Sequence, residues 1–283
     1  MRKRQIILLT AGLVLILLIF FFGNTIPPKS KMPVMPVAMA SQEAALSTQD
    51  VIAAAKSKLP PEVQERITGL ENNVVRGDVV KLKINQYRQL SSFWIDTVGN
   101  MPLGTYYKGK TAKLENSEQN ITFAARKLLS YVFVEQSQPM QTWMATQAKG
   151  LFEDALKINP ANDSAKVGLG ACYMFGNISS NPMQEILKVR EVADKNPDNM
   201  YAQYILGLGD IKTGQYENAI KRFSKVVAKQ PLNLEAIFNL ADTYDRLQDK
   251  ENAIKWYKVA QQMVQVPAAK KEIGQRIETL ENQ

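Results

Sequence analysis

Residues 195–233 read KNPDNMYAQYILGLGDIKTGQYENAIKRFSKVVAKQPLN and contain one complete unit of an internal repeat. It opens on Lys-Asn-Pro-Asp-Asn and closes on Lys-Gln-Pro-Leu-Asn, so that Pro197 and Pro231 stand 34 residues apart. A fixed period of this size indicates a repeat architecture, in which each unit is a small group of elements that stacks on its neighbours. Two apolar segments separated by a turn at Gly214 predict two helices in each unit.

Small and aromatic residues recur at fixed places in two successive units. In residues 200–233 they are Leu206, Gly207, Gly214, Ala219 and Phe223, with a closing Pro231. In residues 234–267 they are Leu240, Ala241, Tyr244, Ala253, Tyr257 and Ala260, with the proline displaced to Pro267. The spacing resembles the tetratricopeptide-repeat (TPR) family, whose pattern is W-x2-L-G-x2-Y, A-x3-F and P. Asp210 stands where that family has tyrosine.

The resemblance extends upstream with less regularity. Residues 163–199 carry Leu169, Gly170 and Tyr173, and a longer inter-helix turn at 176–182 stretches this unit. Before it, Ala148, Phe152, Ala155 and Pro160 match the second helix of a degenerate first repeat. We therefore expect repeat units near 135–162, 163–199, 200–233 and 234–267, followed by a capping helix over 268–283.

The region before the repeats, residues 49–134, is also predicted to be helical. Residues 49–134 show helical spacing of apolar residues without the repeat consensus, and sustained strand alternation occurs nowhere. The sequence predicts an all-α fold, a TPR α-solenoid of antiparallel hairpins preceded by a diverged helical region. That region is either a set of diverged hairpins stacked on the repeats or a separate helical bundle.

An uncharged apolar segment lies near the N-terminus. Residues 6–22 read IILLTAGLVLILLIFFF, and 17 residues of helix span roughly 25 Å, which reaches across a thin bilayer core. We expect residues 1–23 to form a cytoplasmic tip and a transmembrane anchor, and residues 24–48 to form a flexible linker. A cleaved signal peptide is the alternative, but its apolar region is shorter and its cleavage site closer.

Charge beside this segment predicts its orientation. Arg2, Lys3 and Arg4 with the terminal amine outnumber Lys29 and Lys31, so the positive-inside rule places the N-terminus in the cytoplasm. The bulk of the chain would then be periplasmic or otherwise extracytoplasmic. A domain in the cytosol is the alternative. The formal net charge of +8 owes much to these flanking residues, and no basic run with interleaved aromatics indicates nucleic-acid binding.

Composition argues against catalysis and against cofactors. The chain has no histidine and one cysteine, Cys172, so the usual general base, nucleophile pairs and metal-ligand sets are missing. We expect Cys172 to be a buried thiol and predict no enzyme activity, no cofactor and no metal. An enzyme seated in the N-terminal helical region remains a lesser alternative.

Residues 104–111, GTYYKGKT, match the phosphate-loop expression GxxxxGK[ST]. A phosphate loop needs a hydrophobic strand before it that delivers backbone N–H groups to the phosphates, and the preceding Asn100-Met101-Pro102-Leu103 is no such strand. We predict instead a helix that begins near Pro102, with Lys108, Lys110 and Lys113 in solvent, and no nucleotide binding.

The resemblance to TPR proteins implies a partner-binding surface on the first helix of each repeat. Carried over, it gives the inner-face positions Ser164, Val167, Ala171, Met174, Tyr201, Tyr204, Leu208, Ile211, Glu235, Phe238, Asp242 and Asp245. Among these we single out as groove residues Met174, Tyr201, Tyr204, Leu208, Phe238, Asp242 and Asp245. The expected groove is apolar and aromatic with an acidic end. The subclass that grips C-terminal carboxylates uses Lys, Asn and Arg at such positions, which are lacking here.

An apolar groove suits a peptide, an amphipathic helix or an exposed apolar segment of another protein. The resemblance therefore implies a membrane-anchored interaction module, a scaffold or chaperone-like assembly factor of the cell envelope. Packing between helices is the alternative role for Val167, Leu208 and Ile211, and to a lesser degree for Tyr201, Tyr204 and Phe238.

Overall fold

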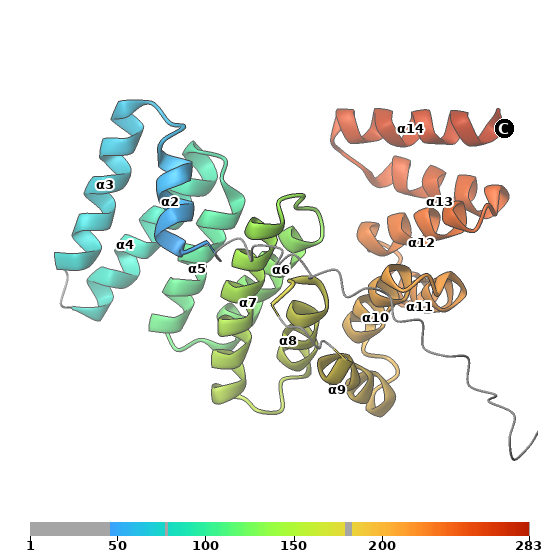
Figure 1. Ribbon diagram of the computed structural model, residues 1–283, viewed down its shortest axis with the longest axis horizontal. Helices are drawn as coiled ribbons and strands as arrows, with labels where there is room; N and C mark the ends of the chain where they lie inside the picture. The colour runs from blue at the N-terminus through green and yellow to red at the C-terminus, as the bar shows by residue number, and fades with distance from the viewer. Residues whose placement is uncertain (1–45, 77–78, 179–182, 283) are drawn as a thin grey trace, which may run out of the picture. The chain divides into compact units, whose positions relative to one another are not determined.

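The computed structural model describes residues 46–76, 79–178 and 183–282, which contain thirteen α-helices, one short π-helix and no strand (Figure 1). The helices are α2 Thr48–Lys56, α3 Pro61–Arg76, α4 Val80–Ser92, α5 Met101–Leu114, α6 Glu118–Val132, α7 Gln138–Ile158, α8 Asp163–Phe175, α9 Met183–Lys195, α10 Met200–Lys212, α11 Tyr216–Lys229, α12 Leu234–Arg246, α13 Lys250–Met263 and α14 Pro267–Glu281; the π-helix η1 is Phe93–Thr97. The all-α prediction is confirmed. The expected anchor at 6–22 lies outside the described residues. None of the described helices is both long and apolar enough to cross a membrane.

Asparagine side chains set where the first helix of each repeat begins. Asn162, Asn199 and Asn233 each accept a hydrogen bond from a backbone N–H three residues on, at 2.9, 3.0 and 3.0 Å. Such an N-cap satisfies one of the N–H groups that a helix start leaves unpaired. As a result α8, α10 and α12 begin at 163, 200 and 234, the repeat starts expected from the sequence.

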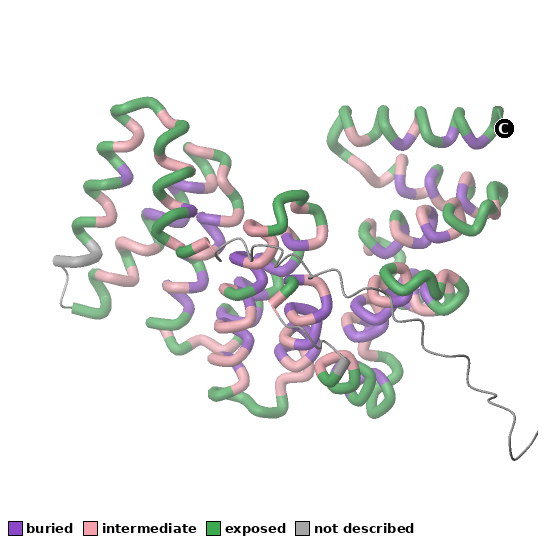
Figure 2. The backbone as a smooth tube through the Cα atoms, viewed as in Figure 1, coloured by how far each residue is buried: buried purple, intermediate pink, exposed green. Residues whose placement is uncertain are grey.

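The consensus residues pack where the two helices of a hairpin cross. A Cβ added at Gly207 on α10 would lie 2.8 Å from Cε1 of Phe223 on α11, so only glycine leaves room for that buried ring. Gly214 has a φ of +74°, a left-handed backbone conformation that favours glycine, and it lies in the turn between these helices. Figure 2 shows the buried residues in stripes along the helices.

Two clusters of buried side chains make up the core. One runs from α2 to α10 and includes Ile205 and Leu206, and the other runs from α10 to α14. Tyr204 and Leu208 are only partly buried and pack against both clusters. Helix α10 therefore joins the N-terminal and C-terminal halves of the described fold.

Asp210, which replaces the consensus tyrosine, forms a polar network inside its repeat. Its carboxylate accepts a hydrogen bond from Nε of Arg222 at 2.8 Å, and Nη1 of Arg222 donates to Oε1 of Gln203 at 2.8 Å. Gln203 in turn donates to the backbone oxygen of Pro197 at 3.1 Å. Burial raises the pKa of Asp210, and the guanidinium of Arg222 acts in the opposite direction. Asp210, where the family pattern has tyrosine, is thus linked by hydrogen bonds to Arg222 of α11 and through it to Gln203.

We predict that Asp210→Ala lowers the free energy of unfolding by about 3 kcal/mol, because it leaves the Arg222 guanidinium without its partner in a largely buried place. The paired change Asp210→Leu/Arg222→Met removes both charges and is expected to cost less than about 1.5 kcal/mol. Urea unfolding followed by far-UV circular dichroism measures both. A double variant as unstable as Asp210→Ala would contradict this account.

The first hairpin begins earlier than the sequence indicated. Residues 135–162 hold one helix, α7, and its partner in the hairpin is α6, which starts at Glu118. The N-cap Ser117, whose Oγ accepts from the N–H of Asn120 at 3.3 Å, marks the true start. Helix α6 lacks the family consensus, so a search for that consensus leaves it outside the repeats.

The phosphate-loop match lies wholly inside α5, which confirms the predicted helix near Pro102. Its two glycines are explained by packing: a Cβ on Gly104 would lie 2.3 Å from Cγ1 of Ile95, and one on Gly109 would lie 2.7 Å from Cδ1 of Leu151. Lys110 places its ammonium 5.4 Å from the ring centre of Tyr106 on the same helix. The two glycines of the motif are therefore explained by the close packing of α5 against neighbouring side chains.

We predict opposite effects for two glycine-to-alanine changes within helices. Gly104→Ala should lower the free energy of unfolding by roughly 1–3 kcal/mol, since its Cβ would also lie 3.0 Å from the backbone oxygen of Ser91. Gly69→Ala on α3, where nothing lies within 4 Å of the new Cβ, should raise it by about 0.5–1 kcal/mol. Thermal and urea unfolding test the pair. A Gly104→Ala variant as stable as the unaltered chain, or more stable, would show that the close approach at Gly104 has no energetic weight.

The C-terminal helix α14 packs on α13 and buries Ile273, Ile277 and Leu280 (Figures 1 and 2). It is also tied to α12, because the guanidinium of Arg276 donates two hydrogen bonds to the carboxylate of Asp245, at 2.7 and 2.6 Å. A two-pronged pair of this kind fixes orientation as well as distance. The last helix is thereby held in a defined position beside the final repeat.

Candidate functional site

One large groove is lined by residues of α6, α10, α12 and α14, together with the start of α8 and Tyr257 of α13. Its volume is about 1400 Å³. Its apolar and aromatic lining is made by Phe123, Phe133, Val134, Met200, Tyr201, Tyr204, Leu208, Leu234, Phe238, Tyr257, Val264 and Ile273. Helix α8 contacts both α6 and α10, and α11 contacts both α10 and α12, so α10 comes between α6 and α12 in the succession of packed helices. Helix α14 follows α12 by way of α13.

The floor of the groove is formed by two tyrosines of α10. The guanidinium of Arg126 lies 4.1 Å from the ring centre of Tyr201, a cation–π contact between α6 and α10. Nδ2 of Asn239 donates to the hydroxyl oxygen of Tyr204 at 3.3 Å. Burial raises the pKa of Tyr204 to about 12, so the phenol keeps its proton at physiological pH. It can therefore act as a hydrogen-bond donor toward a ligand.

Exposed apolar side chains flank this floor from both sides. On α12, Phe238 is 42% exposed and stacks edge-on against Tyr257, with ring centres 5.7 Å apart. On and just after α6, Phe123 is 58% exposed and Val134 76% exposed. Large apolar side chains gathered in this way around one groove mark a binding surface, whereas single exposed ones carry no such meaning.

The structure brings together four of the groove residues expected from the sequence: Tyr201, Tyr204, Leu208 and Phe238. Ser164 and Glu235 also line the groove. The other expected positions do not line it, and these are Val167, Ala171, Met174, Ile211, Asp242 and Asp245. Val167, Ala171 and Met174 are buried in the core between helices. Asp242 pairs with Arg246 at 2.7 Å, and Asp245 pairs with Arg276, so the groove has no acidic end at these residues.

Sequence reasoning missed the contribution of α6. Phe123, Arg126 and Lys127 reach the groove from a helix without the repeat consensus, and Phe133 and Val134 follow its end. A signal was present, since Ser117 precedes apolar residues at helical spacing over 121–132. This pattern predicts the helix α6, but it does not show that side chains of α6 line the groove.

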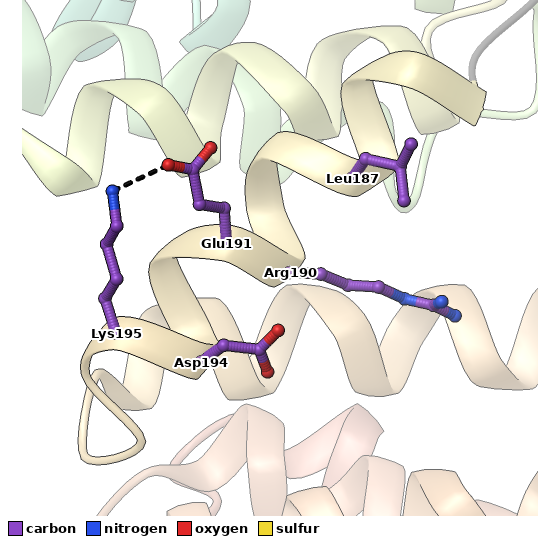
Figure 3. Close-up of a pocket in the computed structure, with 5 residues that line it drawn as sticks. All are labelled: Leu187, Arg190, Glu191, Asp194 and Lys195. Atoms are coloured by element: carbon purple, nitrogen blue, oxygen red, sulfur yellow. Dashed lines mark hydrogen bonds and ion pairs between the residues drawn. The ribbon is translucent and has the colours of Figure 1, made fainter.

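A second hollow lies on α9 and is lined by that helix alone (Figure 3). Its residues are Leu187, Arg190, Glu191, Asp194 and Lys195. Lys195 pairs with Glu191 at 2.6 Å, one turn away on the same helix. Because no second element contributes, the hollow lacks the converging groups of a binding site, and we attach no function to it.

The chemistry of a metal or thiol site is not found in the described residues. Within them, no group of three or more Cys, Asp or Glu side chains could hold a metal ion. Cys172 is buried on α8, and burial raises the pKa of its thiol, which keeps it protonated and inert. The groove offers aromatic, apolar and charged side chains, which are the groups that bind another protein at an interface.

Comparison with known proteins identifies the repeats. Residues 210–269 match the family model described as Tetratricopeptide repeat. The match covers 60 of the 283 residues, about a fifth of the chain, and agrees with the TPR-like helical hairpins that α10 to α13 form. Solenoids of this class use extended surfaces for binding.

The relatives differ widely in size. The chain is 28% identical over 106 residues to Superkiller protein 3 of Schizosaccharomyces pombe; this match covers 38% of the chain but spans only 7% of the yeast protein. Among solved structures, it is similar to PilW, described as a widely conserved type IV pilus biogenesis factor, with a TM-score of 0.47 and 20% identity over 70% of this chain and 86% of PilW. It is also similar to YrrB, described as a TPR protein with an unusual peptide-binding site, with a TM-score of 0.39 and 16% identity over 67% of this chain and 91% of YrrB.

Proposed function

We propose that this protein holds a segment of another protein in the groove between α6, α10, α12 and α14. The observation that carries the proposal is the set of aromatic side chains, Tyr201, Tyr204 and Phe238, from two successive repeats on one surface, with Phe123 on α6 beside them. Large aromatic rings dominate the free energy of most protein interfaces. The segment would be a peptide, an amphipathic helix or an exposed apolar stretch.

Site-specific photo-cross-linking in intact cells tests the groove. A photoreactive amino acid at Tyr204 or Phe238 should capture a defined partner, whereas the same amino acid at Leu187 should not. Leu187 is a matched control because it is an exposed apolar residue on α9, outside the groove.

The double change Tyr204→Ala/Phe238→Ala should weaken that partner's binding by at least roughly thirtyfold, since the loss of one central aromatic residue of an interface commonly costs about 2 kcal/mol and the two losses need not add. Binding is measured by co-purification and by titration of the identified partner. If the double variant still bound every partner as tightly as the unaltered protein does, the groove would not be the binding site.

We further propose that residues 6–22 anchor the chain in a membrane, with the N-terminus cytoplasmic and the rest extracytoplasmic, where it acts as a scaffold or chaperone-like assembly factor. The uncharged apolar run of 17 residues and the basic residues before it support this proposal. An anchored scaffold with its domain in the cytosol is the alternative.

Cysteine labelling separates the two orientations. Cys172 is buried and should stay unlabelled, so Leu232→Cys, at the most exposed large apolar residue of the described fold, adds one reactive thiol. A maleimide that cannot cross the cytoplasmic membrane should label this variant in cells whose outer barrier alone is opened. Labelling only after the cytoplasmic membrane is broken would establish the cytosolic alternative. The unaltered chain is the control.

A further inference from the structure

The two sides of the groove carry charges of opposite sign. On α6, Arg126 and Lys127 are exposed and basic, and on the far side Glu235 of α12 and Glu272 of α14 are exposed and acidic. Among the described residues none of these four side chains has an ion-pair partner within 4.0 Å. The tyrosines of α10 lie between the two charged sides.

The remaining charges of the lining are already engaged. Glu118 accepts hydrogen bonds from Asn162 and Thr122, and Arg276 is held by Asp245. Arg126 stacks on the ring of Tyr201, a contact that leaves its outer N–H groups able to donate. Lys127 places its ammonium 5.3 Å from the ring centre of Tyr131, and this contact also leaves N–H groups able to donate. Because the partners of Glu118 are neutral, the α6 side offers two cations and one hydrogen-bonded anion, and the side of α12 and α14 offers two anions.

The size of the groove fits a short helix. A helix with its side chains has a diameter of about 10–12 Å, so a volume of about 1400 Å³ accommodates at least roughly 12–18 Å of such a helix, with one face left to solvent. At about 1.5 Å per residue, this is roughly 8–12 residues, or two to three turns. An apolar stripe at i, i+3, i+4 and i+7 on such a helix would face Tyr204, Leu208 and Phe238.

We propose that the groove receives an amphipathic helix of a partner protein that carries Asp or Glu on the edge facing α6 and Lys or Arg on the edge facing α12 and α14. This inference rests on the proposed function and specifies its ligand. Turning such a helix end to end while its stripe stays on α10 exchanges the two edges. The four unpaired charges therefore also set the direction in which the partner helix lies.

Designed peptides of about 14 residues test the inference. Three peptides share one stripe of Leu and differ only in their edges: one has a Glu edge and a Lys edge, one has Glu on both, and one has Lys on both. Binding to the full-length protein is measured by fluorescence anisotropy in a fixed detergent at low salt. The Tyr204→Ala/Phe238→Ala variant in the same detergent gives the background.

The native protein should bind the mixed peptide at least roughly fivefold more tightly than either uniform peptide, because each exposed ion pair contributes modestly and is screened by salt. The preference should vanish near 1 M salt. Arg126→Glu/Lys127→Glu makes both sides acidic and should shift the preference to the peptide with two Lys edges. Glu235→Lys/Glu272→Lys should shift it to the peptide with two Glu edges.

The experiment distinguishes failure of the charge inference, of the groove and of the helical ligand. Equal binding of all three peptides by the native protein, above the background of the aromatic variant, overturns the charge inference and leaves the groove in place. Binding that the aromatic variant matches for every peptide overturns the groove itself. A mixed peptide with a central proline, which cannot form an unbroken helix, should bind at background level, and equal binding by it would overturn the helical ligand.

Discussion

Helix α10 packs against both halves of the core and so links the N-terminal helices to the C-terminal repeats. Tyr204 and Leu208 contact the cluster that runs from α2 to α10 as well as the cluster that runs from α10 to α14. The ring of Tyr204 also meets that of Phe223, at 5.9 Å between centres, and Phe223 occupies the space that Gly207 leaves. The floor of the groove is therefore built from the same contacts that hold the repeat together.

The parts of the fold that depend on nearby residues were predictable from the sequence. The Asn caps, the turn at Gly214 and the pairing of Gly207 with Phe223 all act within one repeat, so a period of 34 residues reveals them. The same holds for α5, where the residues before Gly104 excluded a phosphate loop. Cap, turn and packing residues that recur at a constant interval therefore predict where helices begin and where they cross.

The parts of the site that depend on distant residues were not predictable. Whether Asp245 faces a ligand or a protein group is decided by Arg276, which is 31 residues away and reaches back from α14. Likewise α6 contributes Phe123 and Arg126 only because α6, α8 and α10 pack in succession. A consensus taken from one repeat gives the inner positions of that repeat, while contacts between repeats decide which of them reach the groove.

Charged residues in and beside the groove differ in whether another residue of the fold pairs with them. Asp242 and Asp245 have their partners within the fold, which makes them parts of the scaffold. An unpaired charge on a surface costs little, because water solvates it, so Glu235 or Lys127 alone would indicate nothing. What points to a ligand is their arrangement, with cations on α6, anions on α12 and α14, and aromatic rings between them. Such a surface is complementary only to a partner with the reverse order of charges, and this order favours one partner and one direction over others.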